Sequence, residues 1–351
     1  MNKFFLQLSI LCLLSFMFSC NEYKYANTRP FSISDIQETK YLTGEIVDMD
    51  EIIMPRFLFL KDNYLFTINY QQEHFVTVFH LPDMKKTGDF ISFGNGPNEV
   101  LNVSNIQFQD SLVWVLDHSR QQINKYMLNH FFEEKEVVPG EKIKINESFE
   151  KILVMKDRLI TNSLHHIRSR FSFYDMQGNF IENKGNLPDA GVQMTDLELF
   201  EAYFCKMALN PGDESIFVAY INTDLIEIYD SNGSLKTRMH GPDKFYSINK
   251  EVSLGNGQQK ISSIAGKTRS AYYNPIAFED EIWTLYDGKY FDRTVENGFL
   301  LNRIIVFDWD GNPIRQYITD IGFYALTIDR NNGVFYGITL NPEFAFVKFY
   351  F

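Results

Sequence analysis

The side chains in this sequence that could do chemistry lack the spacing of the common catalytic motifs. His165 and His166 form the only adjacent histidine pair. Because neighbours on a strand point to opposite faces, the two rings could share a metal ion only from a loop. The sequence has no Gly-x-Ser-x-Gly elbow and no His-Glu-x-x-His zinc motif. It therefore predicts neither a catalytic residue nor a metal ligand.

The remaining polar residues are suited to binding a ligand. Carboxylates, amides, imidazoles, guanidinium groups and phenols can orient a sugar, a peptide or a partner protein through hydrogen bonds. They fall in separate stretches of the chain, so only a repeating fold could bring them to one surface. The candidate ligand-binding residues are Asn95, Asn98, Glu99, Asp117, His118, Arg120, His165, His166, Arg168, Asn222, Asp224, Tyr290 and Arg293.

One repeat that could position them is a turn between two apolar segments. It is plainest in the stretch Phe108-Gln109-Asp110-Ser111-Leu112-Val113. Successive copies of the turn residue lie 48, 47, 56, 67 and 52 residues apart. Strand–turn–strand units with a period near 50 predict a propeller or a solenoid. The six turn residues are Asp62, Asp110, Asp157, Asp213, Asp280 and Asn332.

A second repeat marks a third strand in each unit. Three of its copies run into a turn that begins with Asp175, Asp230 or Asp308 and has glycine three residues later. Asp favours turn entry, and glycine supplies the positive φ that lets the chain fold back as a fourth strand. The two repeats stay in phase six times, which predicts six four-stranded antiparallel units. The aromatic residues of this repeat are Phe79, Tyr126, Tyr174, Tyr229, Phe307 and Phe349.

These units predict an all-β, six-bladed propeller, because a solenoid would need polar caps at its ends. The last unit stops at its third strand, residues 344–351, where the chain ends. We expect an isolated strand at residues 41–47 to supply the missing outer strand and close the ring without an open edge. Insertions at 242–270 and 287–300 and an irregular piece with a short helix at 189–201 interrupt the period.

In a four-stranded blade, the loops between the second and third strands open on the same face as the loops between blades. The candidate ligand-binding residues all lie in such loops, so the fold would gather them around the mouth of a central channel. The Asp turns would lie on the opposite face, where they repeat too regularly to form a site. This choice of face predicts that replacing His118, Arg120 and Arg168 together abolishes binding and leaves the melting temperature unchanged.

The composition agrees with a large β-rich core. Apolar residues make up 45% of the 351 residues, and aromatic residues make up 16%, led by 33 Phe and 19 Tyr. Bulky rings of this kind cover pleated surfaces. The formal net charge is −12. An acidic chain without a cluster of Lys and Arg does not suit nucleic acid, whose phosphates need a basic surface.

The start of the chain indicates export. Phe4 to Phe18 is an almost wholly apolar run of about 15 residues, shorter than the ~20 that span a bilayer and typical of a secretory leader. The junction Ser19-Cys20 resembles a bacterial lipoprotein cleavage box. The resemblance implies a signal peptide at 1–19, lipid on Cys20 and a tether at 20–30, with the propeller at 31–351. An ordinary leader with a chance cysteine is the alternative.

The cysteines add no disulfide framework and no zinc-type spacing. The three are Cys12, Cys20 and Cys205. Cys12 lies in the leader, and once Cys20 is modified Cys205 has no partner. We therefore interpret Cys205 as a buried, inert thiol.

The loop Phe93-Gly94-Asn95-Gly96-Pro97-Asn98-Glu99 leads from the first unit into the second. Its glycines allow a sharp turn that Pro97 stiffens, and no Lys-Ser/Thr follows, which argues against a phosphate loop. With the six units and the lipoprotein-like leader, this loop resembles the TolB-like six-bladed propeller lipoproteins of Bacteroidetes-type bacteria; the strand patterns alone are also similar to NHL-type propellers. The resemblance covers nearly the whole mature chain and implies an envelope-localised propeller with no catalytic residues to carry over.

Two functions compete; a polysaccharide lyase or glycosidase is a third possibility, but it would need a paired carboxylate or a Tyr/His set that the sequence does not place. The first is a lipid-anchored binding or scaffolding module of the cell envelope, at the outer membrane and as a monomer, which takes a glycan, a peptide or a partner protein. The second is a propeller hydrolase or lactonase with a divalent metal in the channel, held by Glu, Asn and Asp oxygens of several inner strands. The predicted inner strands, such as 105–108, are poor in carboxylates, so we favour the binding module and expect no resident cofactor.

Overall fold

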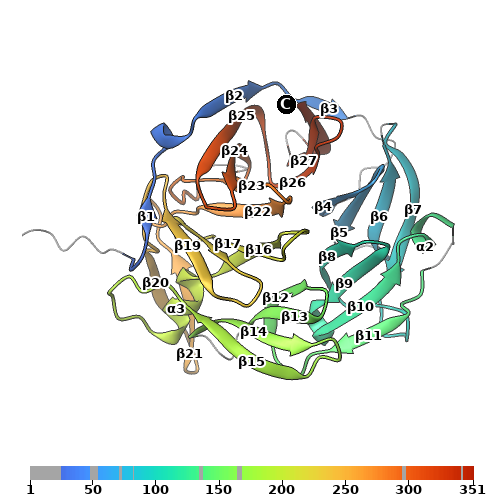
Figure 1. Ribbon diagram of the computed structural model, residues 1–351, viewed down its shortest axis with the longest axis horizontal. Coiled ribbons are helices and arrows are strands. Elements are labelled where there is room, and N and C mark those ends of the chain that lie inside the picture. Colours follow the sequence, from blue (N-terminus) through green and yellow to red (C-terminus); the bar gives the residue numbers. More distant parts are fainter. Residues whose placement is uncertain are drawn as a thin grey trace, which may run out of the picture.

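Six antiparallel sheets surround one central axis in the computed structural model, each as one blade of a propeller (Figure 1). The structure describes residues 25–47, 54–70, 73–81, 83–133, 137–163, 168–294, 298–340 and 343–351. Four strands in sequence order form each of the first five blades, and the sixth takes its outer strand from the N-terminal region. The predicted all-β, six-bladed propeller is confirmed.

The blades follow the order of the chain, with the innermost strand first. Blades one and two contain β4 (Pro55–Lys61), β5 (Tyr64–Asn69), β6 (His74–His80), β7 (Lys85–Ser92), β8 (Val103–Gln109), β9 (Leu112–Asp117), β10 (Gln122–Met127) and β11 (Glu141–Lys144). Blades three and four contain β12 (Phe149–Val154), β13 (Arg158–Ser163), β14 (Ser169–Asp175), β15 (Phe180–Asn186), β16 (Cys205–Leu209), β17 (Ile216–Tyr220), β18 (Leu225–Tyr229) and β19 (Leu235–His240). Blades five and six contain β22 (Tyr272–Ala277), β23 (Glu281–Tyr286), β24 (Leu301–Asp308), β25 (Pro313–Phe323), β26 (Ala325–Asp329), β27 (Val334–Leu340), β28 (Phe344–Tyr350) and β3 (Glu45–Val47).

The two sequence repeats are turns that reverse the chain within a blade. Asp110, between β8 and β9, has a left-handed φ of 51°, a conformation that Asp tolerates better than most residues. Between β14 and β15, the Asp175 carboxylate accepts hydrogen bonds from the backbone N–H groups of Gln177 and Asn179, both at 2.9 Å. Gly178 in the same turn has a φ of 84°. Both repeats are therefore structural.

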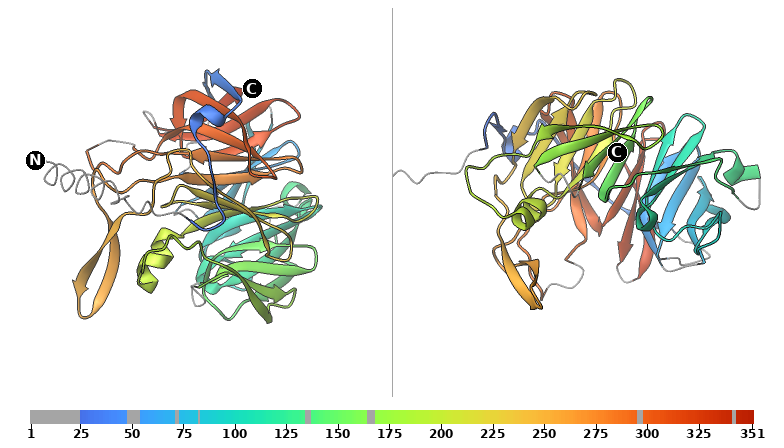
Figure 2. Two further views of the ribbon diagram at one scale, coloured as in Figure 1. Left: turned by 60° about the vertical axis from the view of Figure 1, so that its left-hand side comes forward. Right: turned by 90° about the horizontal axis from the view of Figure 1, so that it is seen from below.

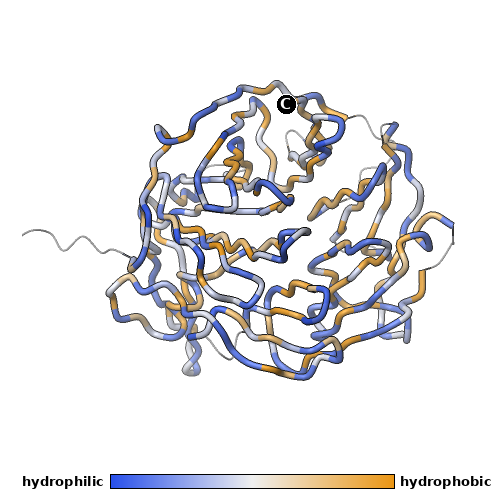
Figure 3. The backbone as a smooth tube through the Cα atoms, in the orientation of Figure 1, coloured by the Kyte–Doolittle hydropathy of each residue, from blue (hydrophilic) through white to orange (hydrophobic). Residues whose placement is uncertain are grey.

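The core lies within and between the blades, where the middle strands are covered on both sides. Every residue of β17 and of β23 is buried. Figure 3 shows hydrophobic residues along many of the strands and hydrophilic residues in many of the loops. Aromatic rings join neighbouring blades, because Phe171 of the third meets Tyr229 of the fourth edge-on at 4.8 Å between ring centres. Phe79 of the first meets Phe346 of the sixth in the same way at 5.7 Å.

Residues 25–47, which we call the N-terminal strap, follow the outer edges of three blades (Figure 1). The first strand, β1 (Arg29–Pro30), pairs in parallel with β19, and β2 (Glu38–Leu42) pairs in parallel with β25. A 3-10 turn, η1 (Ile33–Asp35), lies between them. Only β3 pairs antiparallel with β28 as the outer strand of the sixth blade. The single strand expected at 41–47 is therefore two strands on two blades.

The tether expected at 20–30 also differs from the structure. Cys20 and the leader lie outside the described residues, but the chain packs on the fourth blade from Tyr25 onward. The Tyr25 side chain is buried and its ring stacks on Tyr246 at 5.0 Å between centres. The Arg238 guanidinium donates a hydrogen bond to the Ala26 carbonyl at 2.7 Å. Residues 25–30 are thus part of the propeller.

The predicted insertion at 242–270 and the irregular piece predicted at 189–201 project from one face of the disc. We call this the loop face, because it carries the loops between second and third strands and between blades. Residues 242–270 contain the hairpin β20 (Asn249–Gly255) and β21 (Gln258–Ser263), and the predicted short helix is α3 (Asp196–Ala202). Figure 2 shows the hairpin beside α3, and the Thr195 hydroxyl donates to the Glu251 carboxylate at 2.7 Å.

The other helices among the described residues are short. They are η2 (His118–Arg120), after β9, and α2 (His130–Glu133), after β10. Within the described ranges, no helix has both the length and the apolar character needed to cross a membrane.

Candidate functional site

The loop from Gly94 to Glu99, between the first two blades, is held closed by its own side chains. The Glu99 carboxylate accepts a hydrogen bond from the backbone N–H of Gly96 at 2.6 Å. It lies so close over Gly94 that a Cβ there would clash with its Oε2. Glu99 is therefore part of the turn, while Asn95 is exposed and Asn98 is half-buried.

Asp117 and Arg120 of the second blade brace the same loop. The buried Asp117 carboxylate accepts a hydrogen bond from the backbone N–H of Leu101 at 3.0 Å. The Arg120 guanidinium donates to the carbonyl oxygen of Gly94 at 2.9 Å and to that of Glu99. Both side chains satisfy backbone groups that would otherwise lack partners, so their main role is structural.

The other candidates from the second and third blades are less constrained. His118 is half-buried, with its Nε2 atom 4.0 Å from a carboxylate oxygen of Glu150. Arg168 has an exposed side chain that lies 3.4 Å from a carboxylate of α3. His165 and His166 lie outside the described residues. Because Arg120 braces a loop, the triple variant with His118 and Arg168 should melt at a lower temperature, contrary to our sequence-based expectation.

The fourth-blade candidates also bond within the protein. The Asn222 side-chain amide donates to the carbonyl and to the carboxylate of Glu201, both at 2.9 Å. Asp224 is fully buried, and its Oδ2 accepts hydrogen bonds from the backbone N–H groups of Asp243 and Lys244, each at 2.6 Å. Burial raises the pKa of Asp224 to about 7, although these two bonds act to lower it.

Asp224→Asn should make the protein more stable above pH 7. The pKa of the native carboxyl, about 7, exceeds the ordinary 3.8, so between these two pH values the native state binds more protons than the unfolded state. Its stabilising contribution is therefore complete below the ordinary pKa and is lost as the pH rises through the native one. Asparagine keeps one acceptor oxygen without the charge. We expect a gain of about 1–3 kcal/mol at pH 8 and little change at pH 4.

Urea unfolding at the two pH values measures this effect. Asp196→Asn is the matched control, because the Asp196 side chain is 69% exposed. A loss of stability at pH 8 in Asp224→Asn would show that the ionised carboxylate is needed to hold the backbone N–H groups.

The fifth-blade candidates lie beside a stacked arginine. The exposed ring of Tyr290 is 5.0 Å from the guanidinium of Arg269, which also lies 4.5 Å from the ring of Phe245. Arg293 is exposed, with its guanidinium 5.9 Å from the ring of Phe291. The described candidates therefore form separate groups on successive blades, and most of them contact neighbours on the same or the adjoining blade.

The central channel is lined by the inner strands, and its half next to the Asp turns holds a cavity of about 490 Å³. The Gln107 side chain links the second and third blades there. Its amide nitrogen donates to the carbonyl of Val154 at 2.6 Å, and its amide oxygen accepts from the N–H of Val154 at 2.9 Å. Among the described residues, no three His, Cys, Asp or Glu side chains are placed to hold a metal ion. Other residues that line this cavity are Phe59, Asn105, Leu153, Met207 and Pro275.

The opposite end of the channel gathers three basic residues that the sequence interpretation did not select. Arg56, Lys151 and Lys206 stand near the starts of β4, β12 and β16, the inner strands of the first, third and fourth blades. We call them the channel-mouth cations. The Lys151 ammonium lies 5.9 Å from the ring centre of Phe57 on the first blade. Because the second blade stands between the first and third (Figure 1), these side chains meet across the channel.

Aromatic rings hold the channel-mouth cations in place. The Arg56 guanidinium lies 4.6 Å from the ring centre of Tyr70 and 4.8 Å from that of Phe57. The Lys206 ammonium lies 5.4 Å from the ring centre of Phe204. A ring face attracts a cation without neutralising its charge. No ion pair between described residues includes any of the three cations.

The charges in this cluster perturb one another. The pKa of Lys151 is lowered to about 7, first by burial and then by the positive charges of Lys206 and Arg56. Burial also lowers the pKa of Lys206. The neighbouring Cys205 is fully buried, and burial raises the pKa of its thiol, which fits an inert cysteine. Ionisable groups perturbed in this way mark a candidate binding site.

β-Bulges help to place two of these side chains. The pairing of β4 with β5 shifts between Pro55 and Phe57, where Arg56 stands, and that of β12 with β13 shifts across Lys151. Bulges re-aim side chains and are common beside functional sites. The available sequence signal was a basic residue near the start of an otherwise apolar inner strand, as in Cys205-Lys206-Met207.

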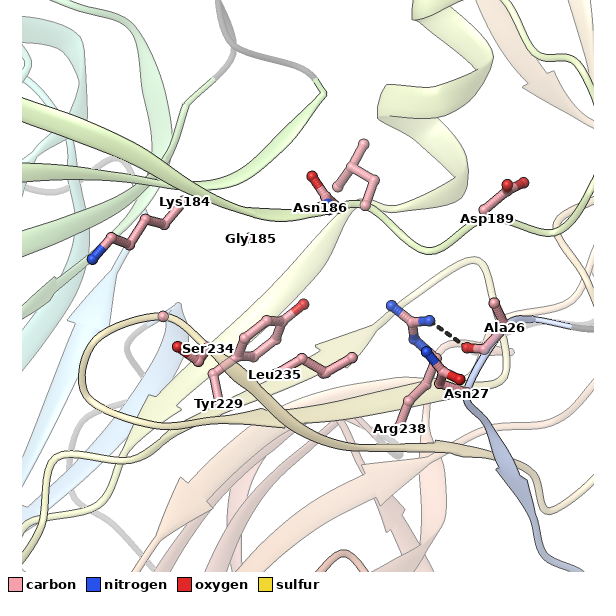
Figure 4. A pocket seen from close by; sticks show the side chains of 12 residues that line it. Ala26, Asn27, Lys184, Gly185, Asn186, Asp189, Tyr229, Ser234, Leu235 and Arg238 are labelled. Atoms are coloured by element: carbon pink, nitrogen blue, oxygen red, sulfur yellow. Dashed lines mark hydrogen bonds between the residues drawn. The ribbon is translucent and has the colours of Figure 1, made fainter.

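A second cavity, of about 500 Å³, opens at the rim between the third and fourth blades (Figure 4). Figure 4 shows Lys184 and Asn186 on one side of it and Tyr229 and Arg238 on the other, with Arg238 bonded to Ala26 of the N-terminal strap. Both of its basic side chains have carboxylate partners, at 3.0 and 2.5 Å. This cavity therefore lacks the uncompensated charge of the channel mouth.

Two solved structures are similar to this chain in fold. A member of the DUF4221 family from Bacteroides vulgatus has 10% identity and a TM-score of 0.55, over 94% of this chain and 98% of that one. A Bacteroides fragilis protein, named as a candidate exported protein, has 11% identity and a TM-score of 0.53, over 92% and 99%. At these identities the likeness concerns the fold alone.

No curated protein matches the chain. The family model described as "TolB-like 6-blade propeller-like" matches residues 35–331, which is most of the sequence. The chain therefore belongs to the TolB-like six-bladed propeller family.

Proposed function

We propose that this protein is an exported, lipid-anchored component of the bacterial cell envelope that acts as a binding or scaffolding module. Its ligand is a glycan, a peptide or a partner protein, and the loop face receives it. The channel-mouth cations carry this proposal. Three like charges held close together, with no carboxylate partner among the described residues, destabilise the folded state, and such strain is typical of sites where a ligand supplies the missing charge.

The start of the sequence supports the location. The apolar run from Phe4 to Phe18 and the Ser19-Cys20 junction resemble the leader of an exported lipoprotein, and the Bacteroides fragilis structure is named as a candidate exported protein. Lipid on Cys20 would attach the protein to a membrane, for which we propose the outer membrane. Tyr25 is already packed on the fourth blade, so only residues 21–24 would link lipid and propeller. Such a link reaches at most about 18 Å, which would keep the propeller at the membrane surface.

A metal-dependent hydrolase has less support at this site. A divalent cation prefers several oxygen ligands, usually with carboxylates among them. The charged side chains nearest the channel mouth are instead mostly positive, and like charges repel strongly where water is partly excluded. The charge at the mouth thus favours ligand binding over a metal centre.

Glycan and peptide arrays probed with the mature domain test the proposed function. The strongest binder would then be used in hydrogen-exchange mass spectrometry. We expect reproducible binding and slower exchange in loop-face segments such as 93–102 and 117–121. Failure to bind on both arrays would contradict a glycan or peptide ligand, and protection confined to the Asp turns on the other face would contradict the choice of the loop face.

A further inference from the structure

We propose that the channel-mouth cations form an oxyanion site, in which Arg56, Lys151 and Lys206 bind a carboxylate, sulfate or phosphate group of the ligand. This inference rests on the proposed binding function and names the chemistry of its ligand. The site lies where three inner strands begin, at the loop-face end of the channel.

The three side chains offer complementary contacts to an oxyanion. The Arg56 guanidinium, held by the rings of Tyr70 and Phe57, is a planar fork that can donate to two oxygens of one group. Lys151 and Lys206 add compact positive charges from the third and fourth blades. A group between these blades and the first could therefore be contacted from opposite sides of the channel.

The charge balance supports the same conclusion. The chain as a whole carries a net charge of −12, yet the ion pairs between described residues include none of these three cations. Glu150 is the carboxylate that acts on Lys151, and it does so more weakly than Lys206 and Arg56. Among the described groups that act on Lys151, the positive charges therefore outweigh the negative one, which leaves the channel mouth positive. An oxyanion would restore neutrality at partly buried positions, where charges are screened less than in open water.

Binding at this site should take up a proton. The pKa of Lys151 is about 7 because burial, Lys206 and Arg56 lower it more than Cys205 and Glu150 raise it. An anion favours the protonated ammonium, so it raises this pKa, and the complex binds more protons than the free protein. The affinity for an anion should therefore rise by up to about tenfold between pH 8 and pH 6.

Isothermal titration calorimetry on the mature domain tests the inference at constant ionic strength. The probes are sodium sulfate, inorganic phosphate, galacturonate and the neutral sugar galactose. Sulfate serves for the pH series because its charge does not change between pH 6 and pH 8. Two buffers with different ionisation enthalpies give the number of protons taken up. We expect one or more of the anions to bind, with proton uptake, and galactose not to bind.

The test variant combines Lys151→Gln with Lys206→Gln. It should lose at least about tenfold in anion affinity, because two charge-assisted hydrogen bonds are removed. Its melting temperature should equal or exceed that of the wild type, because two desolvated, mutually repelling charges are gone. Lys260→Gln, in the exposed β20–β21 hairpin, is the control and should bind like the wild type.

The probes distinguish the sources of the oxyanion. Binding of galacturonate alone would assign the site to carboxylates, and binding of sulfate and phosphate would assign it to tetrahedral oxyanions. Either result supports the inference if the double variant no longer binds that anion. No anion binding by the wild type, equal binding of galactose, or unchanged affinity in the double variant would overturn it. If the arrays still yield a ligand in that case, only the oxyanion chemistry fails and the binding function stands.

Discussion

Glu227→Ala should destabilise the protein by about 3–5 kcal/mol. The Glu227 carboxylate is fully buried and accepts hydrogen bonds from Arg238 at 2.5 Å, from the hydroxyl of Tyr229 at 2.7 Å and from that of Tyr220. Alanine would leave the buried Arg238 guanidinium without its carboxylate and two buried hydroxyls without an acceptor. An unpaired buried charge costs far more than an exposed one.

The effect should extend beyond the fourth blade, because the hydrogen-bond network joins three parts of the protein. Arg170 of the third blade donates to the Tyr220 hydroxyl at 3.2 Å. Arg238 donates to the Ala26 carbonyl of the N-terminal strap at 2.7 Å. Removing the Glu227 charge should therefore loosen the contact between the third and fourth blades and the start of the strap together.

Urea unfolding followed by tryptophan fluorescence and circular dichroism measures this loss. Glu182→Ala is the matched control, because Glu182 pairs with Lys184 at 3.0 Å but its side chain is 46% exposed. An exposed pair of this kind contributes less than about 1 kcal/mol. If the two variants were equally stable, water or a rearranged side chain would have to satisfy Arg238 in place of Glu227.

The sequence predicted the blades because each blade is a local unit. The turns at Asp110 and Asp175 are defined by bonds and dihedral angles within a few residues, so a short pattern carries the information. The N-terminal strap has no such pattern. Its strand β1 has two residues, Arg29 and Pro30, and pairs with Met239 and His240 far along the chain. Two residues are too few to show a hydrophobic period. Parallel pairing with a distant strand also involves no tight turn that a sequence pattern could reveal.

The site was harder to predict because one type of residue serves two purposes. Asp117, Arg120 and Asn222 are polar residues in loops, as ligand-binding residues are, but they satisfy backbone groups of neighbouring segments. Whether a loop carboxylate faces solvent or a buried N–H depends on packing that the sequence does not display. Lys151 and Lys206 come from adjoining blades and meet Arg56 of the first blade only when the blades close into a ring, so their shared electrostatics has no sequence signature.

The N-terminal strap should contribute more stability than any single side chain outside it. A chain that starts at Gly44 should be less stable than one that starts at Tyr25 by roughly 5–9 kcal/mol, since burying each large apolar side chain stabilises by about 1.5–3 kcal/mol. The shorter chain loses Tyr25, Phe31 and Ile36, which are 5%, 3% and 8% exposed. Domain stabilities are about 5–15 kcal/mol, so the shorter chain should be close to unfolding at room temperature.

Phe31→Ala in the longer chain measures the contribution of this buried side chain separately from that of the strap's backbone pairing. The Phe31 ring meets Phe307 of the fifth blade edge-on at 5.7 Å, and its loss should cost about 3–5 kcal/mol. Phe93→Ala is the control, because that ring is 57% exposed. If the chain from Gly44 melted like the chain from Tyr25, the blades would close without β1 and β2. If it unfolds instead, the N-terminal strap is needed to hold the propeller together. Because the strap begins only five residues after Cys20, the segment that carries the proposed lipid would then also stabilise the fold.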